Sequence, residues 1–141
     1  MLKLRTMVVG AERLGAGYAV DQDDPRITRV GRILRRTSVD ELPQLWNVLR
    51  GDMSVIGPRP TLRYQVEQYD ERQRRRLEIR PGLTGWAQVH GRASLPWAER
   101  IELDVWYVEH CSPRVDLAIL LRTPLALFRG TYRGATGGWR T

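Results

Sequence analysis

Residues 36–60 constrain the fold more than any other stretch, because a proline interrupts a sequence that otherwise favours a helix. Apolar residues recur there at the 3.6-residue period of a helix with one apolar face: Leu42, Leu45, Trp46 and Leu49. Pro43 would remove a backbone donor and crowd the preceding turn. The helix therefore either kinks at Pro43 or begins there, and we expect it to stop near Gly51, where positive φ is favoured.

Two adjacent carboxylates, Asp40 and Glu41, lie at the start of this helix. Ser38 precedes Glu41 by three residues, which predicts a capping box. A helix N-terminus stabilises an anion by a few tenths to about 1 kcal/mol, so we expect Asp40 to be exposed and ionised. An ionised carboxylate can bind a hard cation such as Mg²⁺ or attack an electrophile. The plainer alternative is that these residues only cap the helix.

The segments that follow are interpreted as a strand, a rigid turn and a glycine-containing break. Residues 53–57 predict a short strand, and the two prolines of residues 57–60 predict a rigid turn that presents Arg59. An arginine held in this way suits a bidentate grip on a diphosphate. Residues 80–85 contain two glycines, which allow close backbone approach to an anion.

The chain is strongly basic, with 23 Lys and Arg against 16 Asp and Glu and a net charge of +7. Such a balance indicates an anionic partner: nucleic acid, phospholipid head groups or a phosphorylated substrate. Residues 26–37 predict a basic amphipathic helix. Its apolar stripe consists of Ile27, Val30 and Leu34, with Ile33 at its edge. Its arginines suit anionic lipid or a nucleic-acid backbone. Few aromatic residues lie among them to stack bases, which argues against nucleic acid.

The remaining pattern predicts one α+β domain over residues 1–141, mostly helical with a few short strands. The predicted elements are a strand at 1–9, a loop at 10–25, a largely solvated helix at 61–79, a strand at 86–89, helices at 96–110 and 113–129, and a frayed tail at 130–141. Lys3 and Arg5 share one face of the first strand. No apolar run reaches the roughly 18 residues that a membrane-spanning helix needs.

Two acids near apolar stripes and one cysteine complete the candidates. Asp104 lies beside the core stripe of the helix at 96–110, where it needs a partner such as arginine because burying an unpaired charge is costly. Asp116 interrupts the helix at 113–129, which can pack in the core or lie among lipid head groups. Cys111 is interpreted as a small residue at a helix end.

Four blocks of the chain, in order, resemble the bacterial sugar transferases that start polysaccharide and glycoconjugate assembly, the monotopic phosphoglycosyl transferases. The blocks are KLRTM (3–7), RTSVDELPQLWNVLRGDMSVIGPRP (36–60), RPGLTGWAQV (80–89) and ELDVWY (102–107) followed by Asp116. The likeness spans nearly the whole chain and is far more specific than a short motif.

The resemblance implies transfer of a sugar-1-phosphate from a UDP-sugar to a polyprenyl phosphate such as undecaprenyl phosphate, with UMP leaving. It implies a covalent phosphosugar intermediate on Asp40, assisted by Glu41, with Mg²⁺ held by Asp40 and Glu41. The candidate substrate-binding residues are Lys3, Arg5, Arg36, Arg59, Arg80, Gln88, Asp104 and Asp116.

Family members carry an N-terminal hydrophobic re-entrant helix ahead of the block that begins at Lys3. A chain without it is expected to sit peripherally at the cytoplasmic face of the bacterial inner membrane, with amphipathic helices at the anionic surface. Two alternatives remain: a non-catalytic membrane-binding module or inactive fragment, and a nucleic-acid-binding protein. The sequence leaves open whether the chain forms a homodimer.

Overall fold

The computed structural model describes residues 1–14, 24–91 and 95–128. Helices dominate this part and two short strands accompany them, which confirms the predicted α+β class with a helical majority. The elements are η1 (Ala11–Arg13), α1 (Arg29–Thr37), η2 (Val39–Glu41), α2 (Gln44–Leu49), β1 (Ser54–Ile56), α3 (Arg63–Val66), α4 (Glu71–Arg74), η3 (Arg75–Leu77), β2 (Gly82–Thr84), α5 (Trp86–Val89), α6 (Trp97–His110) and α7 (Pro113–Phe128).

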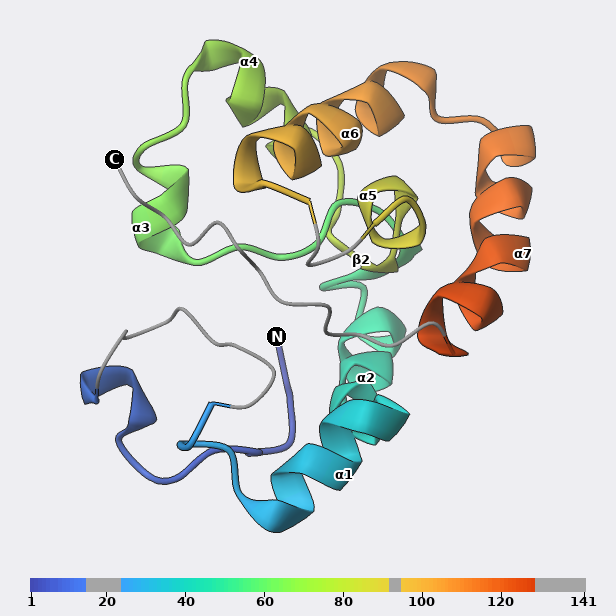
Figure 1. The fold of residues 1–141 in the computed structure, drawn as a ribbon. Coiled ribbons are helices and arrows are strands. Elements are labelled where there is room, and N and C mark those ends of the chain that lie inside the picture. The colour runs from blue at the N-terminus through green and yellow to red at the C-terminus, as the bar shows by residue number, and fades with distance from the viewer. Residues whose placement is uncertain (15–23, 92–94, 129–141) are drawn as a thin grey trace.

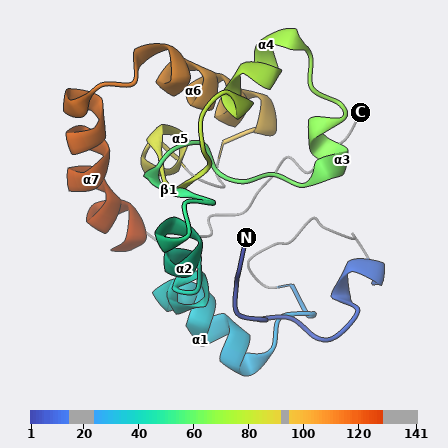
Figure 2. The ribbon, with the colours of Figure 1, turned by 180° about the vertical axis from the view of Figure 1, so that it is seen from behind.

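The helices form two ends joined through a small centre. Figure 1 places α1 and α2 at one end and α3, α4 and α6 at the other, with α5 and the strands between them. Seen from both sides, α7 runs from the end of α6 back toward α2 (Figures 1 and 2). The segment that carries the two adjacent acids, η2, lies between α1 and α2 and therefore at one end of the molecule.

The N-terminal segment packs against the start of α1 instead of forming the strand predicted for residues 1–9. Among the described residues its one ladder contact is an antiparallel bridge between Met7 and Ile27. Because Ile27 is extended in this bridge, α1 starts later than predicted. Thr28 caps the helix, its Oγ1 accepting a hydrogen bond from the Gly31 N–H at 2.9 Å.

The apolar stripe predicted in residues 26–37 is buried only in part. Ile27 is buried and Leu34 is half-buried, whereas Val30 and Ile33 each expose 65% of their surface. The buried residue of α1 is Gly31, and a Cβ built there would lie 1.9 Å from the carbonyl oxygen of Thr6. The helix thus meets the N-terminal segment through its glycine and leaves apolar side chains to the solvent.

Ser38 ends α1 rather than capping the next helix. It lies in the left-handed region at φ 57°, and its N–H donates to the carbonyl of Arg35 at 3.2 Å. Its side chain makes no cap hydrogen bond, so the predicted capping box with Glu41 is wrong. The chain turns into η2, which carries both acids, and Pro43 then precedes α2 as its N-cap. The alternative that the helix begins at the proline is confirmed, and the positive φ of 80° at Gly51 follows its end.

The two strands pair in parallel at the centre of the molecule. The register pairs Ser54 with Gly82 and Ile56 with Thr84. The strand predicted within residues 53–57 is confirmed. The strand predicted at residues 86–89 is wrong, because the extended residues lie just before it and residues 86–89 form α5.

The helix predicted over residues 61–79 is broken into α3, α4 and η3. Asp70 starts α4 with a reciprocal cap. Its carboxylate accepts from the Gln73 N–H at 2.7 Å, and the Gln73 side chain accepts from the Asp70 N–H at 3.3 Å. This cap explains the break, because it requires extended backbone at Asp70.

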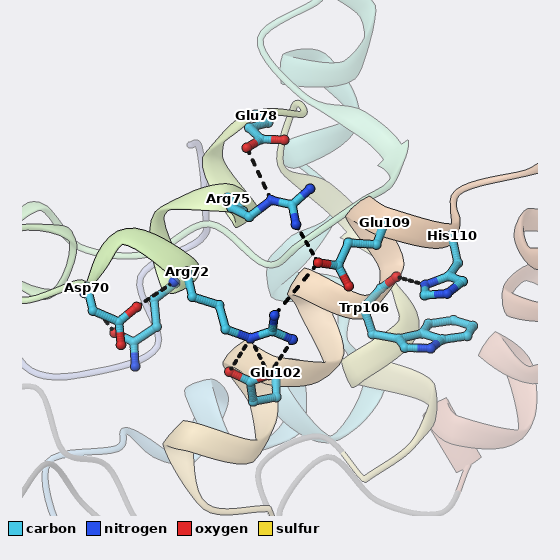
Figure 3. A network of polar contacts seen from close by, with 9 residues as sticks. Asp70, Arg72, Arg75, Glu78, Glu102, Trp106, Glu109 and His110 are labelled. Carbon is cyan, nitrogen blue, oxygen red and sulfur yellow. Dashed lines mark hydrogen bonds and ion pairs between the residues drawn. The ribbon is translucent and has the colours of Figure 1, made fainter.

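The arginines of this region divide between the surface and the interior. Arg72 binds Glu102 of α6 at 3.0 Å and Arg75 binds Glu109, both on the surface (Figure 3). For these two the predicted solvated surface is confirmed. For Arg76 the prediction is wrong, because only 4% of its surface is exposed.

The core lies between α6 and the chain that surrounds α3 and α4. Tyr69, Ile101 and Val105 form a buried cluster, and Val66 and Trp97 pack against it. The helices predicted at residues 96–110 and 113–129 are confirmed within a residue or so by α6 and α7.

The ends of these helices agree with the sequence where they are described. Cys111 is exposed directly after α6, as predicted. The frayed tail predicted at residues 130–141 and most of the loop predicted at 10–25 lie outside the described residues. Within the described ranges, no helix has the length and apolar content to cross a membrane.

Gly31→Ala is expected to destabilise the protein by about 1–3 kcal/mol, because the added methyl group would overlap the Thr6 carbonyl. On an open helix face the same change would stabilise by up to about 1 kcal/mol. Urea unfolding measures the difference. Arg32→Ala at the exposed neighbouring position is the control, and a Gly31→Ala variant as stable as this control would contradict the close approach.

Candidate active site

Asp40 lies in η2 with only 2% of its surface exposed. The prediction that it is exposed at a helix N-terminus is therefore wrong. The left-handed turn at Ser38 folds η2 inward, and the N-terminal segment covers it: the Leu4 N–H donates to the Asp40 carbonyl at 3.0 Å. The carboxylate is compensated by a side chain rather than by a helix end.

That side chain is Lys3, whose Nζ lies 3.0 Å from Oδ2 of Asp40 and 3.5 Å from Oε1 of Glu41. The contact with Asp40 is an ion pair without hydrogen-bond alignment, so Oδ2 remains without a hydrogen-bond donor. An ammonium between two acids relieves their mutual repulsion. Asp40 and Glu41 are called the dyad below. The pairing of Lys3 with the dyad brings together three residues that the sequence assigned to one site.

Lys3 is placed by main-chain hydrogen bonds on either side of it. The Leu2 N–H donates to Oδ1 of Asn47 at 2.7 Å, and the Leu4 N–H donates to the carbonyl of Asp40. Asn47 is buried on α2. Asn47 was not predicted from the sequence. A polar residue on the inner face of an otherwise apolar helix is the feature that would have indicated it.

Arg59 is the second cation of the site. Its Nη2 lies 2.6 Å from Oε1 of Glu41. Burial raises the pKa of Glu41, but Arg59 and Lys3 together outweigh this effect and lower the pKa below its ordinary value. Glu41 is therefore ionised at neutral pH, and its ion pairs stabilise the fold above the ordinary carboxyl range and weaken as the pH falls through it.

The loop that carries Arg59 is fixed to β2. The Gly57 N–H donates to the Thr84 carbonyl at 2.9 Å, and the Gly82 N–H donates to the Pro58 carbonyl at 2.8 Å. A Cβ on Gly82 would lie 2.1 Å from the Gly57 nitrogen, so these glycines permit the close approach. The rigid turn predicted at residues 57–60 thus presents Arg59 from a fixed backbone.

The dyad offers two carboxylates to a cation. No group of three or more metal-ligating side chains occurs within residues 1–14, 24–91 and 95–128. Mg²⁺ commonly binds through one or two carboxylates together with substrate phosphates. Oδ2 of Asp40 is ion-paired with Lys3 at 3.0 Å, so Lys3 would have to turn away before a metal ion could bind this oxygen. The dyad therefore suits Mg²⁺ that arrives with a phosphorylated ligand.

Three of the predicted substrate-binding residues lie at the surface. Arg5 is exposed on the N-terminal segment and Arg36 is exposed in the last turn of α1. Arg80 is exposed after η3, with its guanidinium close to Gly51. Their roles stay predictions.

Of the other three, Asp104 and Gln88 are buried and Asp116 is half-buried. Asp104 is paired with Arg76, and burial raises its pKa to about 6 although neighbouring arginines oppose this. Asp116 accepts a hydrogen bond from the Tyr107 hydroxyl at 2.7 Å. Gln88 is buried on α5, and neither atom of its amide has a hydrogen-bond partner. Substrate binding by these residues also stays a prediction.

A surface hollow lies away from the dyad, on α4 and η3. It is lined by Asp70, Glu71, Arg72, Arg74, Arg75 and Glu78. Figure 3 shows that several of these side chains bind one another and α6. The hollow is thus a surface ion-pair network, and the chemistry of the molecule is concentrated instead where two acids meet two cations.

The chain is similar to known proteins over most of its length. The family model of the bacterial sugar transferases matches residues 1–130. The chain is 49% identical over 123 residues to an uncharacterized sugar transferase, EpsL, of Bacillus subtilis (strain 168), covering 87% of this chain and 59% of EpsL. It is 46% identical over 113 residues to an undecaprenyl-phosphate galactose phosphotransferase of Salmonella typhimurium, covering 79% of this chain and 24% of the relative.

Similar values hold for a rhizobial relative. An exopolysaccharide production protein, ExoY, of Sinorhizobium fredii is 47% identical over 113 residues, covering 79% of this chain and 50% of ExoY. The chain thus spans between about a quarter and three fifths of the length of these relatives.

Arg59→Ala is expected to raise the pKa of Glu41, because it removes the nearer of the two cations that lower it. The pKa can be measured by carbon-13 NMR titration of the side-chain carboxyl in buffer without divalent metal. Arg63→Ala, at an exposed arginine that pairs with Glu67, is the control and should leave Glu41 unchanged. An unchanged pKa in Arg59→Ala would show that Arg59 does not contact the dyad.

Proposed function

Since the chain belongs to the bacterial sugar transferase family, we propose that it transfers a sugar-1-phosphate from a UDP-sugar to a polyprenyl phosphate and releases UMP. The names of its relatives support this reaction class: they include an undecaprenyl-phosphate galactose phosphotransferase and a UDP-galactose-lipid carrier transferase. UDP-galactose and UDP-N-acetylgalactosamine are the first donors to test, because the latter sugar occurs in the name of an Aeromonas relative.

One observation carries the proposal: the buried carboxylate of Asp40 is ion-paired with Lys3, and the adjacent Glu41 binds both Lys3 and Arg59, two cations that suit a diphosphate. Phosphoryl transfer depends mainly on positioning and on neutralising phosphate charge. Lys3 and Arg59 both contact Oε1 of Glu41 and so supply positive charge at the dyad.

The proposed reaction has two displacements at one phosphorus atom. An oxygen of Asp40 bonds to the phosphorus that bears the sugar, and the bond to the bridging oxygen breaks, so that UMP leaves with the electron pair. A phosphate oxygen of the polyprenyl phosphate then attacks the same phosphorus. The bond to Asp40 breaks, its carboxylate is restored, and the sugar diphosphate remains on the lipid.

Binding of the donor must uncover Asp40, because the N-terminal segment and Lys3 cover it in this structure. The diphosphate brings negative charge that competes with the dyad for Lys3 and Arg59. Both side chains are partly exposed, 28% for Lys3 and 45% for Arg59, so each can turn toward a ligand at the surface. We propose that this exchange of partners frees the nucleophile.

Mg²⁺ would be held by Asp40 or Glu41 together with the donor phosphates, and when bound it would neutralise phosphate charge. The protein's own cations act in the same direction. Glu41 holds Lys3 and Arg59 in place before the donor arrives, since both contact its Oε1.

A lipid acceptor requires the site to lie at a membrane surface, and the exposed apolar residues fit this need. Around the dyad they are Leu2, Leu4, Val30, Ile33, Leu42, Leu45, Trp46 and Leu49. A further group lies on α7, namely Leu117, Leu120, Leu121, Leu125 and Leu127. Arginines on α1 add attraction to anionic lipid. We propose that α1, α2 and α7 rest in the head-group region.

Asp40→Asn is expected to lower UMP release by about a thousandfold or more, because an amide cannot form the covalent intermediate. The assay follows UMP with a UDP-sugar, Mg²⁺ and undecaprenyl phosphate in vesicles. Glu67→Gln, the same change from acid to amide at an exposed acid paired with Arg63, is the control and should behave like the parent. Turnover near the parent rate in Asp40→Asn would refute the assignment of the nucleophile.

Trp46→Glu combined with Leu49→Glu is expected to reduce sedimentation with anionic vesicles severalfold, because the two changes place charge where apolar side chains would enter the interface. Leu77→Glu, at an exposed leucine on η3, is the control. Equal sedimentation of the two variants would exclude α2 as a membrane-contacting helix.

A further inference from the structure

Arg76 is a buried cation that joins four parts of the chain. Its Nη1 donates to the Tyr69 hydroxyl at 2.6 Å, and its Nη2 donates to Asp104 of α6 and to the carbonyl of Arg59 at 3.0 Å. Its guanidinium also lies over the rings of Tyr69 and Trp97, 5.7 and 5.9 Å from their centroids. Only the bond to Arg59 reaches the loop that serves the dyad.

That bond completes the fixation of the loop at residues 57–60. On one side the loop is tied to β2 through Gly57 and Pro58. The tie from Arg76 falls on the residue whose side chain contacts Glu41. A backbone held on both sides leaves Arg59 only its side-chain rotations with which to meet a ligand.

We propose that Arg76 is a positioning residue, which holds the Arg59 carbonyl and thereby sets where the Arg59 guanidinium meets the dyad and the donor diphosphate. The part that concerns the diphosphate rests on the proposed function. The part that concerns the dyad does not, because the contact between Arg59 and Glu41 exists without substrate.

The chemistry of the guanidinium explains why arginine occupies this position. A buried charge needs a counter-charge, and Asp104 provides it. Burial raises the pKa of Asp104 to about 6, while the charge and hydrogen bond of Arg76 favour its ionised form. The planar fork of arginine reaches three acceptors in fixed directions, whereas lysine keeps the charge but loses this geometry.

Arg76→Lys tests the proposal without requiring turnover. The side-chain Nε–Hε resonance of Arg59, observed by nitrogen-15 NMR, reports whether its guanidinium is held. In the parent we expect a dispersed, slowly exchanging signal. In Arg76→Lys we expect it to move toward the position of a free arginine and to exchange at least severalfold faster. Arg75→Lys, the same change at a surface arginine paired with Glu109 (Figure 3), should leave it unchanged.

Kinetics separates positioning from a merely structural role. Arg76→Lys is expected to lower kcat/KM for the UDP-sugar by about tenfold, the scale of one hydrogen bond to a charged group. Combined with Arg59→Ala it should add little further loss, because Arg76 acts through Arg59. Independent, additive losses, or an unchanged Arg59 resonance in a folded Arg76→Lys, would overturn the proposal.

A second variant covers the case in which Arg76→Lys does not fold. Arg76→Gln combined with Asp104→Asn replaces the buried ion pair with two neutral amides and removes the unpaired charge. The same loss of the held Arg59 signal is expected, and its retention would contradict the proposal. If the parent releases no UMP, the proposed function fails while the Arg59 resonance still decides the positioning.

Discussion

The compensation of two adjacent acids by Lys3 and Arg59 is the interaction on which the rest of the structure depends. Two carboxylates side by side repel each other, and one of them, Asp40, is almost fully buried. The N-terminal segment and the loop at residues 57–60 each bring one cation to the pair. Neither segment packs in the core between α6 and α3–α4. Both instead place a cation beside the two acids, where the proposed chemistry requires positive charge.

The scaffold reaches this arrangement through close backbone contacts rather than through a large apolar core. Gly31 lets the N-terminal segment lie on α1, and Gly57 and Gly82 let the loop lie on β2. Arg76 then joins the loop to α6, across the centre of the molecule. Apolar side chains remain exposed on α1, α2 and α7, and these are the side chains that the proposed lipid interface would cover.

The sequence predicted the elements whose signals are local. Pro43 and Gly51 marked the limits of α2, and Pro96 marked the start of α6. The sequence-based predictions were wrong where a distant contact decides the local structure. Ser38 is a residue type that favours an N-cap, but it takes a left-handed conformation where the chain folds inward. Residues 86–89 were predicted as a strand and form a helix.

The candidate site shows the same division. Residues 36–60 and the block at Lys3 identified the dyad and both cations, through resemblance as much as through pattern. The burial of Asp40 could not be read from spacing, because it results from a segment 37 residues away in sequence lying over it. The interior role of Arg76 was hidden in an arginine run, although the need of Asp104 for a basic partner pointed toward it.

The central claim is that Asp40 becomes covalently bound to phosphorus. The most direct measurement is intact-protein mass spectrometry, followed by peptide mapping, after exposure to a UDP-sugar with Mg²⁺ and without polyprenyl phosphate. A sugar-phosphate mass on the peptide that contains Asp40, removed when polyprenyl phosphate is added, is the predicted result. Release of UMP and transfer of the sugar phosphate to the lipid acceptor with no adduct, or with an adduct on another residue, would contradict it.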